Sequence, residues 1–498
     1  MLLNLILEKI LSGLDYEVIN NKNLSCDIKN LTIDSRQVVN GSMFFCIKGL
    51  NVDGHNFINE AVEHGAKTIV LENDFKDFNM DNDVVIIKVK NTRQAVAFCS
   101  ANFFGYRDSD MNLIGVTGTN GKTSTTYLIR KILAEYGKNV GLIGTIDAKE
   151  NDKHINIFYA TSTTPDPIEL HKILKYMREK RISDVVMEVS SHALSLHKVD
   201  ALNFKIGIFT NLTQDHLDFH GNMGNYLDAK RRLFDLCEIG ILNKDDSAVN
   251  YIVKKSRCKF MFYGIKSDCD FKAENIVCTA RDISFDVKIN NRLESFYVGI
   301  PGKFNVYNSL GAIAATSCFG VPIEIIKSAL KKMTSVPGRM QKIESDKFNI
   351  IIDYAHSPDS LRNVLLAIRK LCKRKLILVF GCGGDRDKGK RKVMGKIASE
   401  LADYCIVTSD NPRTEEPMEI INEIEKGIKL GVDKNFKYEK ICDRSEAIKR
   451  AIEIYCEGDV ILITGKGHEN YQIFADRTVH FDDVETAKEI IDSWGKNK

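Results

Sequence analysis

The sequence predicts an α/β protein of three domains, each built on a largely parallel sheet, and two observations carry this prediction. Apolar runs of strand length alternate with helix-patterned stretches along almost the whole chain, as expected where helices connect parallel strands. The chain has 498 residues, which is too long for a single hydrophobic core. We therefore expect domains at residues 1–108, 109–336 and 337–498.

The first domain shows short strands on either side of a helix. MFFCIKG (43–49) and KTIVLE (67–72) are apolar runs of strand length, and FINEAVEHGA (57–66) has its apolar residues at helical spacing. The opening MLLNLILEKI (1–10) has no basic start and no small-residue cleavage site. It therefore predicts a first helix and not a signal peptide.

The second domain opens on a strand, a glycine-rich loop and a helix. LIGV (113–116) is the strand, TGTNGK (117–122) is the loop, and apolar residues then recur at helical spacing over 123–136 before Gly137. Two further strands are predicted at SDVVMEV (183–189) and KIGIF (205–209). This order is typical of an ATPase domain with a mostly parallel sheet.

The third domain, which we start at Pro337, repeats one pattern in which a strand runs into a glycine-rich or polar loop. The predicted strands are FNIIIDY (348–354), KLILVFG (375–381), ADYCIVTS (402–409) and GDVILITG (458–465). We predict a Rossmann-like α/β domain. Because ligands of open parallel sheets bind beyond the carboxyl ends of the strands, we expect chemistry in these loops.

Composition and charge exclude several functional classes. Hydrophobic residues make up 44% and charged residues 28%, as in ordinary soluble proteins. The 70 basic and 67 acidic residues leave a formal charge of +3, too little to attract nucleic acid or an anionic membrane. We read the basic run Lys388–Lys392 as a solvated face. No apolar stretch reaches the roughly eighteen residues of a membrane span.

The thirteen cysteines are scattered and form no CxxC pair. This usage is typical of free thiols in a reducing compartment, and it disfavours a disulfide framework or a zinc site. We therefore expect a cytoplasmic protein without membrane insertion and without a nucleic-acid partner.

The strongest motif is the glycine-rich segment from Gly115 to Thr123. A strand, a glycine turn and a helix in this order direct backbone N–H groups at phosphate. Lys122 is placed to reach the terminal phosphates, and the Thr123 hydroxyl is placed to bind Mg²⁺. Val116 stands where the strict phosphate-loop pattern has its first glycine. A tight turn with a surface lysine is the alternative, which the strand and helix disfavour.

Two acidic motifs follow, and their spacing alone does not decide their role. Glu188 ends an apolar strand, where it would either hold a metal opposite the phosphate loop or face solvent. The segment NLTQDHLDFHG (211–221) places Asp215, His216, Asp218 and His220 within six residues. A metal site, a catalytic base and a hydrogen-bonded loop all remain open for it.

Three loops of the third domain combine cations with acceptors. Arg386 lies in the loop 381–387, Asp410 to Arg413 form a second loop, and Gly465 to Glu469 form a third. Guanidinium groups bind carboxylates, and carboxylates and amide oxygens bind ammonium. The set therefore favours a zwitterionic amino acid over a nucleotide.

Taken in order, these motifs resemble the Mur ligase family over essentially the whole chain. The matching segments are DSR (34–36), DGHNF (53–57), TGTNGKT (117–123), TTPD (163–166), EVSSHAL (188–194), NLTQDHLDFHG (211–221), DAKRRLF (228–234), PGKFNVYN (301–308), PGRM (337–340), DYAHSPDSL (353–361), GCGGDRDKGKR (381–391), DNPR (410–413) and GKGHE (465–469). The phosphate loop is the family's own variant, which accounts for Val116. The resemblance implies that the first domain binds a uridine nucleotide and the second binds ATP.

The resemblance also assigns residues to the reaction centre. Lys122, Glu188, His216 and Lys230 would be catalytic, and Mg²⁺ would be held by Thr123, Glu188, His216 and Lys230, the last carbamylated to an anion. The residues implied for ATP are Gly118, Thr119, Asn120, Gly121, Lys122, Thr123, Asn305, Asn308, Arg339, Asp353 and His356.

The remaining implied contacts concern the other two substrates. Those with the UDP-muramoyl dipeptide are Ser35, Thr163, Thr164, Ser190, Lys198 and Lys230. Relatives commonly carry Gln-His-Arg where this chain has Leu196-His197-Lys198, and lysine cannot reproduce an arginine fork. The implied amino-acid contacts are Arg386, Asp410, Asn411, Pro412, Arg413, Gly465 and Glu469.

The activity implied is ligation in cytoplasmic peptidoglycan precursor synthesis. ATP would phosphorylate the D-glutamate carboxylate of UDP-N-acetylmuramoyl-L-Ala-D-Glu, and the amine of meso-2,6-diaminopimelate would then displace phosphate. Arg413 indicates diaminopimelate because it can pair with the distal carboxylate, whereas lysine-adding relatives usually have a small residue there. We expect the domains to close around the substrates, and the protein to be a monomer.

Several alternatives stay open at this point. The same ligase could add L-lysine, or the chain could be a folylpolyglutamate-synthetase-like ligase. A scaffold that has lost turnover is disfavoured by Lys122, Glu188, His216 and Lys230. A phosphate-loop switch or kinase would have no use for the three loops of the third domain.

Overall fold

The computed structural model describes residues 5–20, 23–49, 52–73, 83–106, 111–146, 148–150, 153–155, 163–279, 282–289, 292–345, 347–370, 372–431 and 436–496. They form two compact units. The first comprises Met1–Gly115, Lys138–Gly207 and Arg232–Glu238, and the second comprises Val116–Gly137, Ile208–Arg231 and Ile239–Lys498. The three domain boundaries given above stay predictions.

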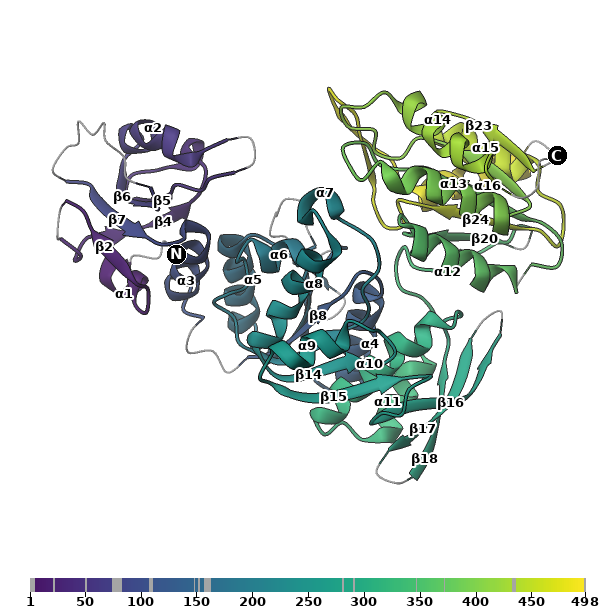
Figure 1. Ribbon diagram of the computed structural model, residues 1–498, viewed down its shortest axis with the longest axis horizontal. Helices are drawn as coiled ribbons and strands as arrows, with labels where there is room; N and C mark the ends of the chain where they lie inside the picture. The colour runs from purple at the N-terminus through teal and green to yellow at the C-terminus, as the bar shows by residue number, and fades with distance from the viewer. Residues whose placement is uncertain are drawn as a thin grey trace. The chain divides into compact units, whose positions relative to one another are not determined.

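The N-terminal part of the first unit is a five-stranded sheet with a helical layer on each face. Its strand order is β2 (Tyr16–Val18), β7 (Val85–Val89), β6 (Ala66–Leu71), β5 (Ser42–Phe45) and β4 (Asn30–Thr32), with β2 antiparallel and the others parallel. Met43 and Phe45 pack with α1 (Leu7–Leu11) and α3 (Thr92–Phe103), while Phe44 packs with α2 (Ile58–Glu63). Figure 1 shows these helices on opposite sides of the strands.

The predicted elements of this part are largely confirmed. The strands at 43–49 and 67–72 correspond to β5 and β6, and the helix between them to α2. The first helix is shorter than predicted: β1 (Leu5–Ile6) pairs with β3 (Asp27–Ile28) before α1 begins, and residues 1–4 lie outside the described part. Two 3₁₀ turns complete the set, Ser35–Gln37 and Gly54–Phe57.

The large sheet has the order β11-β10-β9-β12-β8-β13-β14-β15-β16-β17-β18. Its strands are β8 (Asn112–Thr117), β9 (Val140–Ile143), β10 (Ala148–Glu150), β11 (Lys153–His154), β12 (Asp184–Glu188), β13 (Phe204–Phe209), β14 (Cys237–Asn243), β15 (Lys259–Gly264), β16 (Phe271–Cys278), β17 (Ile283–Ile289) and β18 (Arg292–Val298). The pairs β12–β9, β14–β15 and β15–β16 are parallel. Strands β16 to β18 form an antiparallel extension.

The helices of this region include the one predicted after the phosphate loop. In the first unit they are α5 (Pro167–Glu179) and α6 (Ser191–Ser195), with a 3₁₀ turn at Arg232–Asp235. In the second unit they are α4 (Lys122–Glu135), α7 (Leu217–His220), α8 (Met223–Arg231), α9 (Val249–Lys255), α10 (Phe304–Cys318) and α11 (Ile323–Lys331). The predicted strands at 113–116, 183–189 and 205–209 are confirmed as β8, β12 and β13.

The C-terminal sheet confirms the Rossmann-like prediction. Its order is β19 (Gln341–Ile343), β20 (Ile350–Asp353), β24 (Val460–Thr464), β21 (Leu376–Phe380), β22 (Tyr404–Val407) and β23 (Lys437–Lys440), parallel throughout except for β19. Helices α12 (Pro358–Arg369), α13 (Gly389–Leu401) and α14 (Pro417–Ile428) cover one face, and α15 (Arg444–Glu453) and α16 (Asp483–Lys496) cover the other. A hairpin of β25 (Tyr471–Ile473) and β26 (Thr478–His480) follows β24.

This topology brings the predicted loops to one edge. Strands β20, β21, β22 and β24 are parallel neighbours, so their carboxyl ends meet at the same side of the sheet. The three loops that the sequence singled out follow β21, β22 and β24. Alternate strand residues enter the two helical layers, for example Leu378 on one face and Val379 on the other.

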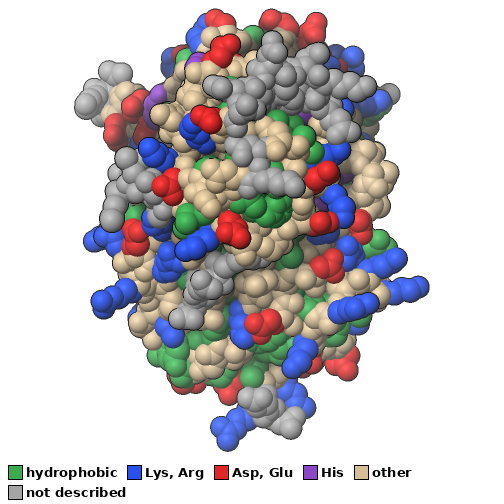
Figure 2. Space-filling view, turned by 90° about the vertical axis from the view of Figure 1, so that its left-hand side faces the viewer, with side chains coloured by type: hydrophobic (Ala, Val, Ile, Leu, Met, Phe, Trp, Pro, Cys, Tyr) green, Lys and Arg blue, Asp and Glu red, His purple; other side chains and the backbone are tan. Residues whose placement is uncertain are grey.

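The cysteine prediction is confirmed, whereas the prediction for the basic run Lys388–Lys392 is partly wrong. All thirteen cysteines are free, as predicted. No helix of the described residues is long and apolar enough to cross a membrane. Basic and acidic side chains are interspersed on the face shown in Figure 2. The solvated reading of Lys388–Lys392 is wrong for two of its members, because Lys390 is 8% exposed and Arg391 is 1% exposed.

Candidate active site

The phosphate loop of the second unit requires glycine at two positions. Gly118 has φ +148°, and a Cβ there would lie 1.8 Å from Thr210 Oγ1. Gly121, the residue before α4, has φ +88°, and a Cβ there would lie 2.4 Å from Asn308 Oδ1. Any side chain would collide with these neighbours, so the close approach of the loop to β13 and α10 depends on the missing Cβ atoms.

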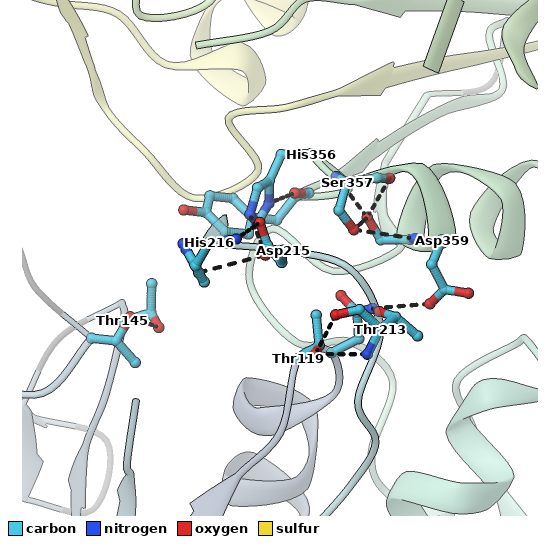
Figure 3. Close-up of polar contacts among 12 residues, drawn as sticks. Thr119, Thr145, Thr213, Asp215, His216, His356, Ser357 and Asp359 are labelled. Atoms are coloured by element: carbon cyan, nitrogen blue, oxygen red, sulfur yellow. Dashed lines mark hydrogen bonds and ion pairs between the residues drawn. The ribbon is translucent and has the colours of Figure 1, made fainter. Parts of the chain in front are cut away.

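The segment after β13 holds this loop by hydrogen bonds. The N–H of Thr119 donates to Asn211 O at 2.9 Å, and the N–H of Asn120 donates to Asn211 Oδ1 at 2.9 Å. Thr210 Oγ1 donates to Asn120 O at 2.6 Å, and the N–H of Thr213 donates to Thr119 Oγ1 at 3.0 Å. Figure 3 shows Thr119 and Thr213 in contact. Residues 210 to 213 therefore position the loop, a role that the sequence did not assign to them.

Lys122 begins α4 and folds back over the loop. Its Nζ donates to the carbonyls of Gly118 and Thr119, at 3.0 Å each. The first turn of a helix presents N–H groups and the positive end of the helix dipole. The ammonium, the glycine turn and the helix start together form an arrangement suited to phosphate.

Lys230 lies beneath the same loop, where it is 1% exposed. Its Nζ donates to Gly118 O at 2.8 Å and lies 4.4 Å from the centroid of the Tyr226 ring. Burial, together with the charge of Lys122, lowers the pKa of Lys230 well below its usual value. Its charged helix would suggest a solvated lysine, but the side chain is buried, and the lowered pKa increases the share of the neutral amine, the form that reacts with electrophiles.

The acidic segment 211–221 divides into two groups. Asp215 lies between two histidines, with its Oδ2 3.5 Å from His216 Nε2 and 3.9 Å from His356 Nε2 (Figure 3). His220 packs on the Tyr226 ring, with centroids 4.9 Å apart. Within the described residues no three His, Cys, Asp or Glu side chains are grouped so as to hold a metal. A metal at this segment would thus need ligands of other kinds.

The charges around Asp215 keep it ionised. Burial alone would raise the pKa of Asp215, but the charges of His356 and His216 outweigh burial and lower it to about 2. Burial and the charge of Lys390 lower the pKa of His356. His216 has φ +52°, an uncommon conformation outside glycine.

Predicted ATP residues from α10 and the C-terminal sheet lie against the phosphate loop. Asn308 Nδ2 donates to Asn305 Oδ1 at 2.9 Å, and both side chains are buried. Arg339 Nη2 donates to Thr123 Oγ1 at 3.0 Å, and its guanidinium lies 4.3 Å from the Tyr354 ring centroid. The structure thus groups these residues with Lys122 in the second unit.

Two carboxylates complete this region. Asp353, at the end of β20, accepts hydrogen bonds from the N–H groups of Met340 and Ala355, both at 2.8 Å. Burial raises the pKa of Asp353, against the attraction of Arg339. Asp359 Oδ2 accepts from Asn120 Nδ2 at 3.0 Å.

In the first unit, Glu188 is buried at the end of β12, so the alternative of a solvent-facing glutamate is wrong. Its exposed fraction is 2%, and its two oxygens accept from the N–H of Thr145 at 3.0 Å and from Thr145 Oγ1 at 2.9 Å. Thr164 Oγ1 donates to Glu188 O at 2.9 Å and accepts from the N–H of Ser190 at 3.0 Å. Thr163 and Ser190 join the same cluster through Thr145 and Thr164.

The other two residues predicted for the UDP-muramoyl substrate lie elsewhere in the first unit. Lys198 Nζ forms an ion pair with Asp166 Oδ1 at 2.8 Å, and Asp166 immediately precedes α5. Ser35 is buried in a 3₁₀ turn after β4, and its carbonyl lies 3.1 Å from His64 Nδ1. The first unit therefore contains five of the six candidates, and the sixth, Lys230, lies in the second unit.

Two arginines meet in the loops predicted to bind the amino acid. A Cβ on Gly383 would lie 2.9 Å from Arg413 Nη1 and 3.7 Å from Arg386 Cγ. Arg413 Nη1 donates to Gly384 O at 2.8 Å, and Arg386 Nη1 donates to Asp385 O at 3.0 Å. Burial and the charge of Arg386 lower the pKa of Arg413. The two arginine side chains thus approach each other at Gly383, and guanidinium groups are suited to binding carboxylates.

Acceptors and a buried lysine lie beside them. Lys466 Nζ donates to Asn411 Oδ1 at 3.0 Å and lies 3.6 Å from Asp410 Oδ1. Glu469 accepts from Asn411 Nδ2 at 2.9 Å and from the Tyr354 hydroxyl at 3.1 Å. Burial and the charge of Asp410 raise the pKa of Glu469. This group can accept an ammonium, and it brings together the loops that the sequence predicted.

Backbone shape adds to this group. Arg413 has φ +54°, and its N–H donates to Ile473 O at 3.0 Å. Gly465 has φ +114°, and a Cβ there would lie 2.7 Å from Asp410 Oδ2. Pro412 O closely approaches Gly384, where a Cβ would lie 1.8 Å from it. The loops after β21, β22 and β24 thus pack against one another.

Comparison with known protein families identifies the family of this chain. Residues 27–104 match the catalytic domain of the Mur ligase family, residues 116–316 match its middle domain, and residues 338–467 match its glutamate ligase domain. The chain belongs to the Mur ligase family.

Among Mur ligases, similar relatives carry one name. UDP-N-acetylmuramoyl-L-alanyl-D-glutamate--2,6-diaminopimelate ligase of Clostridium tetani is 45% identical over 98% of this chain and 99% of its own. The enzyme of the same name from Clostridium botulinum is 44% identical over 97% and 99%.

Solved structures agree with this. A structure of UDP-N-acetylmuramoyl-L-alanyl-D-glutamate--2,6-diaminopimelate ligase has a TM-score of 0.69 at 28% identity and covers 99% of each chain. The MurF ligase of Thermotoga maritima in complex with ADP has a TM-score of 0.62 at 19% identity, covering 93% of this chain and 97% of its own, and shows the shared fold.

Some residues of the site were missed by sequence reasoning. Tyr226 closes over Lys230 and Thr119, and nothing in its local pattern marks it. Lys466 lies inside the GKGHE segment, of which only Gly465 and Glu469 were predicted to bind the amino acid. Lys390 and Arg391 were hidden by a basic run that looks solvated.

Proposed function

We propose that this chain is the ATP-dependent ligase that adds meso-2,6-diaminopimelate to the D-glutamate carboxylate of UDP-N-acetylmuramoyl-L-Ala-D-Glu. The observation that carries the proposal is the Arg386–Arg413 pair beside the Asp410, Asn411 and Glu469 acceptors. Diaminopimelate has an ammonium and a carboxylate at each end, and this group offers partners for both. The names of the relatives support the same substrates.

The first step is transfer of the γ-phosphoryl group of ATP to the carboxylate, giving an acyl phosphate and ADP. Lys122, the loop N–H groups and the start of α4 bind the phosphates, and Arg339 approaches from the C-terminal sheet through its contact with Thr123. Asn305 and Asn308 lie on the adenine side. The site then excludes water, so that the acyl phosphate is not hydrolysed before the amine attacks it.

The second step is attack by the amine. Arg413 and Arg386 hold carboxylates of diaminopimelate, and Asp410, Asn411 and Glu469 hold its distal ammonium. The free amine adds to the acyl carbon, its proton is lost, and phosphate leaves with the electron pair of the C–O bond. L-Lysine lacks the second carboxylate, so it would leave Arg413 without a partner.

Magnesium fits the donors that we propose for it. Thr123 and Glu188 supply oxygen, which Mg²⁺ prefers, and Glu188 is a buried carboxylate at a strand end. His216 is a less typical ligand for so hard an ion. When bound, the metal would neutralise negative charge on the phosphates.

Carbamylation of Lys230 is also part of the proposal. The neutral amine adds to CO₂, an N–C bond forms, one proton is released, and an anion replaces the amine. The lowered pKa of Lys230 supports this reaction because it increases the neutral fraction. An anion there would also remove the repulsion from Lys122.

We place the UDP-muramoyl group on the first unit, through Ser35, Thr163, Thr164, Ser190 and Lys198. To bind a substrate anion, Lys198 would either give up its ion pair with Asp166 or use the remaining hydrogen-bond donors of its ammonium. We further propose that the enzyme acts as a monomer in the cytoplasm.

Product analysis tests this proposal. The protein is incubated with UDP-N-acetylmuramoyl-L-Ala-D-Glu, ATP, Mg²⁺ and meso-diaminopimelate, and the products are separated and weighed by mass spectrometry. We expect the nucleotide tripeptide together with equal amounts of ADP and phosphate. Hydrolysis of ATP without a new amide, or ligation of glutamate to a folate instead, would contradict the proposal.

A further inference from the structure

Tyr354, the residue that follows β20, lies between a loop predicted to bind ATP and a loop predicted to bind the amino acid. Its hydroxyl donates to Glu469 Oε1 at 3.1 Å, and its ring centroid lies 4.3 Å from the guanidinium carbon of Arg339. No step of the reaction described above uses this tyrosine. One side chain therefore contacts a residue assigned to each of two substrates.

The two loops meet beside the tyrosine at a pair of glycines. Gly338 has φ +64°, and a Cβ there would lie 2.3 Å from His468 N. Gly467 has φ +56°, and a Cβ there would lie 2.7 Å from Tyr354 Cβ and 2.8 Å from Gly338 O. Any side chain at these positions would collide with the opposite loop, so the two backbones pack directly against each other. A shift of one loop would therefore displace the other.

Packing restricts the ring of Tyr354. The ring centroids of His356 and His468 lie 4.6 and 5.0 Å from its own centroid. His356 Nδ1 also lies 2.8 Å from Tyr354 O. A side chain that is fixed by its neighbours can hold a substrate-binding group in a defined geometry. The ring is thus a firm support for both of its polar contacts.

The first of these contacts orients Glu469. Tyr354 donates to one carboxylate oxygen, and Asn411 Nδ2 donates to the other at 2.9 Å. Each oxygen keeps a second acceptor position for an ammonium. Burial and the charge of Asp410 raise the pKa of Glu469, and the hydrogen bond from Tyr354 acts in the opposite direction. The hydroxyl therefore favours the ionised form, which is the form that binds a cation.

The second contact orients Arg339. The face of an aromatic ring attracts a guanidinium group. Arg339 Nη2 in turn donates at 3.0 Å to Oγ1 of Thr123, which lies in the first turn of α4. The ring of Tyr354 therefore helps to hold the guanidinium beside the phosphate loop.

We propose that Tyr354 is a positioning residue for two substrates: its hydroxyl holds the Glu469 carboxylate for the distal ammonium of the amino acid, and its ring holds the Arg339 guanidinium for ATP. This inference rests on the proposed function. Neither part of the tyrosine touches a bond that forms or breaks. Loss of either part should therefore weaken the binding of its own substrate and leave the chemical step largely intact.

Two replacements of similar shape separate the two roles. Tyr354→Phe removes the hydroxyl and keeps the ring, whereas pentafluorophenylalanine at the same position also reverses the charge distribution over the ring face. Tyr438→Phe is the matched control, because Tyr438 OH donates to Glu425 Oε1 at 2.9 Å in the same sheet region, outside both loops. We would measure kcat, the KM values for meso-diaminopimelate and ATP, the pH profile and thermal unfolding.

We expect Tyr354→Phe to raise the KM for diaminopimelate by about 10- to 100-fold, with kcat and the KM for ATP changed by less than about threefold. The acidic limb of kcat/KM for diaminopimelate should move to higher pH, because Glu469 loses a hydrogen bond that favours its ionised form. Pentafluorophenylalanine should in addition raise the KM for ATP by about 3- to 30-fold. Tyr438→Phe should match the wild type in all of these measurements.

A tyrosine with a merely structural role would lower activity only in proportion to the unfolded fraction and would leave the acidic limb in place. That result would overturn the inference, as would an unchanged KM for diaminopimelate in Tyr354→Phe or the same KM for ATP in both replacements. A wild-type enzyme that forms no amide with diaminopimelate would instead refute the proposed function, so the two failures can be told apart.

Discussion

The phosphate loop and the amino-acid loops lie in the same unit, yet they are held in different ways. Neutral hydrogen bonds and two glycines fix the phosphate loop against residues 210–213 and Asn308. Buried charges hold the amino-acid loops, with Arg391 between Glu415 and Glu423. The first region offers backbone geometry to a group that every nucleotide carries. The second region recognises one amino acid through the charges of its side chains.

The largest effect on the phosphate loop is expected from a substitution at Gly118. Gly118→Ala places a methyl group 1.8 Å from Thr210 Oγ1 in a backbone conformation that alanine rarely adopts. We expect ATP-dependent ligation to fall by more than about 1,000-fold, because the loop can no longer approach β13. Ligation rate and ATP binding by calorimetry measure this.

Gly137→Ala is the matched control. Gly137 also has positive φ, at +84°, but a Cβ there meets nothing within 4 Å. It should cost only about 1 kcal/mol of stability and leave the rate unchanged. Equal rate losses in the two variants would mean that the close approach at Gly118 is unimportant.

Lys230 tests this comparison further, because it is an ionisable side chain buried beneath the phosphate loop, which is otherwise held against residues 210–213 by neutral hydrogen bonds. Lys230→Ala should lower kcat by about 100- to 1,000-fold, because the carbamate would be absent. Wild-type enzyme in CO₂-depleted buffer should lose activity and regain it with bicarbonate. The variant should not respond to bicarbonate. Wild-type activity that is independent of CO₂ would contradict carbamylation.

The charged region should show pH dependence. Hydrogen bonds from Arg391, against burial, lower the pKa of Glu415 to about 2. A lowered carboxyl pKa adds stability above the unfolded value of 4.5, and this stability is lost as the pH falls toward 2. Glu415→Gln should therefore cost about 2 kcal/mol at pH 7 and progressively less below pH 4.5.

Denaturant unfolding at pH 7 and at pH 3 measures this effect. Glu446→Gln is the control, because Glu446 forms an exposed pair with Lys449 at 3.5 Å. It should change stability by less than about 0.5 kcal/mol at either pH. A cost for Glu415→Gln that does not depend on pH would show that packing, and not charge, holds the loops.

The smallest effect is expected from a single neutral hydrogen bond. Tyr226 OH lies 3.2 Å from Thr119 Oγ1, and Tyr226→Phe removes that contact while keeping the ring over Lys230. We expect a loss of about 1 kcal/mol in ATP affinity and little change in kcat. A larger loss would mean that the phosphate loop depends on this one bond more than on its backbone contacts.

Much of this organisation could be predicted from the sequence, because strands, glycine turns and helix starts are determined by residues that are close together in the chain. The strand into Lys122 and the strands before Arg386, Asp410 and Gly465 were all found by pattern, and parallel topology then brings their ends together. Glu188 could not be decided, since burial of a strand-end carboxylate depends on Thr145, which is distant in sequence.

Burial of cations was the main failure. Nothing in KGKRK distinguishes Arg391, which two distant glutamates neutralise, from its exposed neighbour Lys392. Lys230 and Tyr226 were equally hidden, because the contact between them depends on how α8 packs against the phosphate loop. Sequence patterns report local shape, whereas these charges depend on the assembled fold.

The most direct test of the central claim is the rate of ligation with meso-diaminopimelate and with L-lysine, for the wild type and for Arg413→Ala. We predict that the wild type prefers diaminopimelate by at least about 100-fold and that Arg413→Ala loses most of this preference by losing activity with diaminopimelate. Equal use of both amino acids by the wild type, or an unchanged preference in Arg413→Ala, would contradict the assignment of Arg413 to the distal carboxylate.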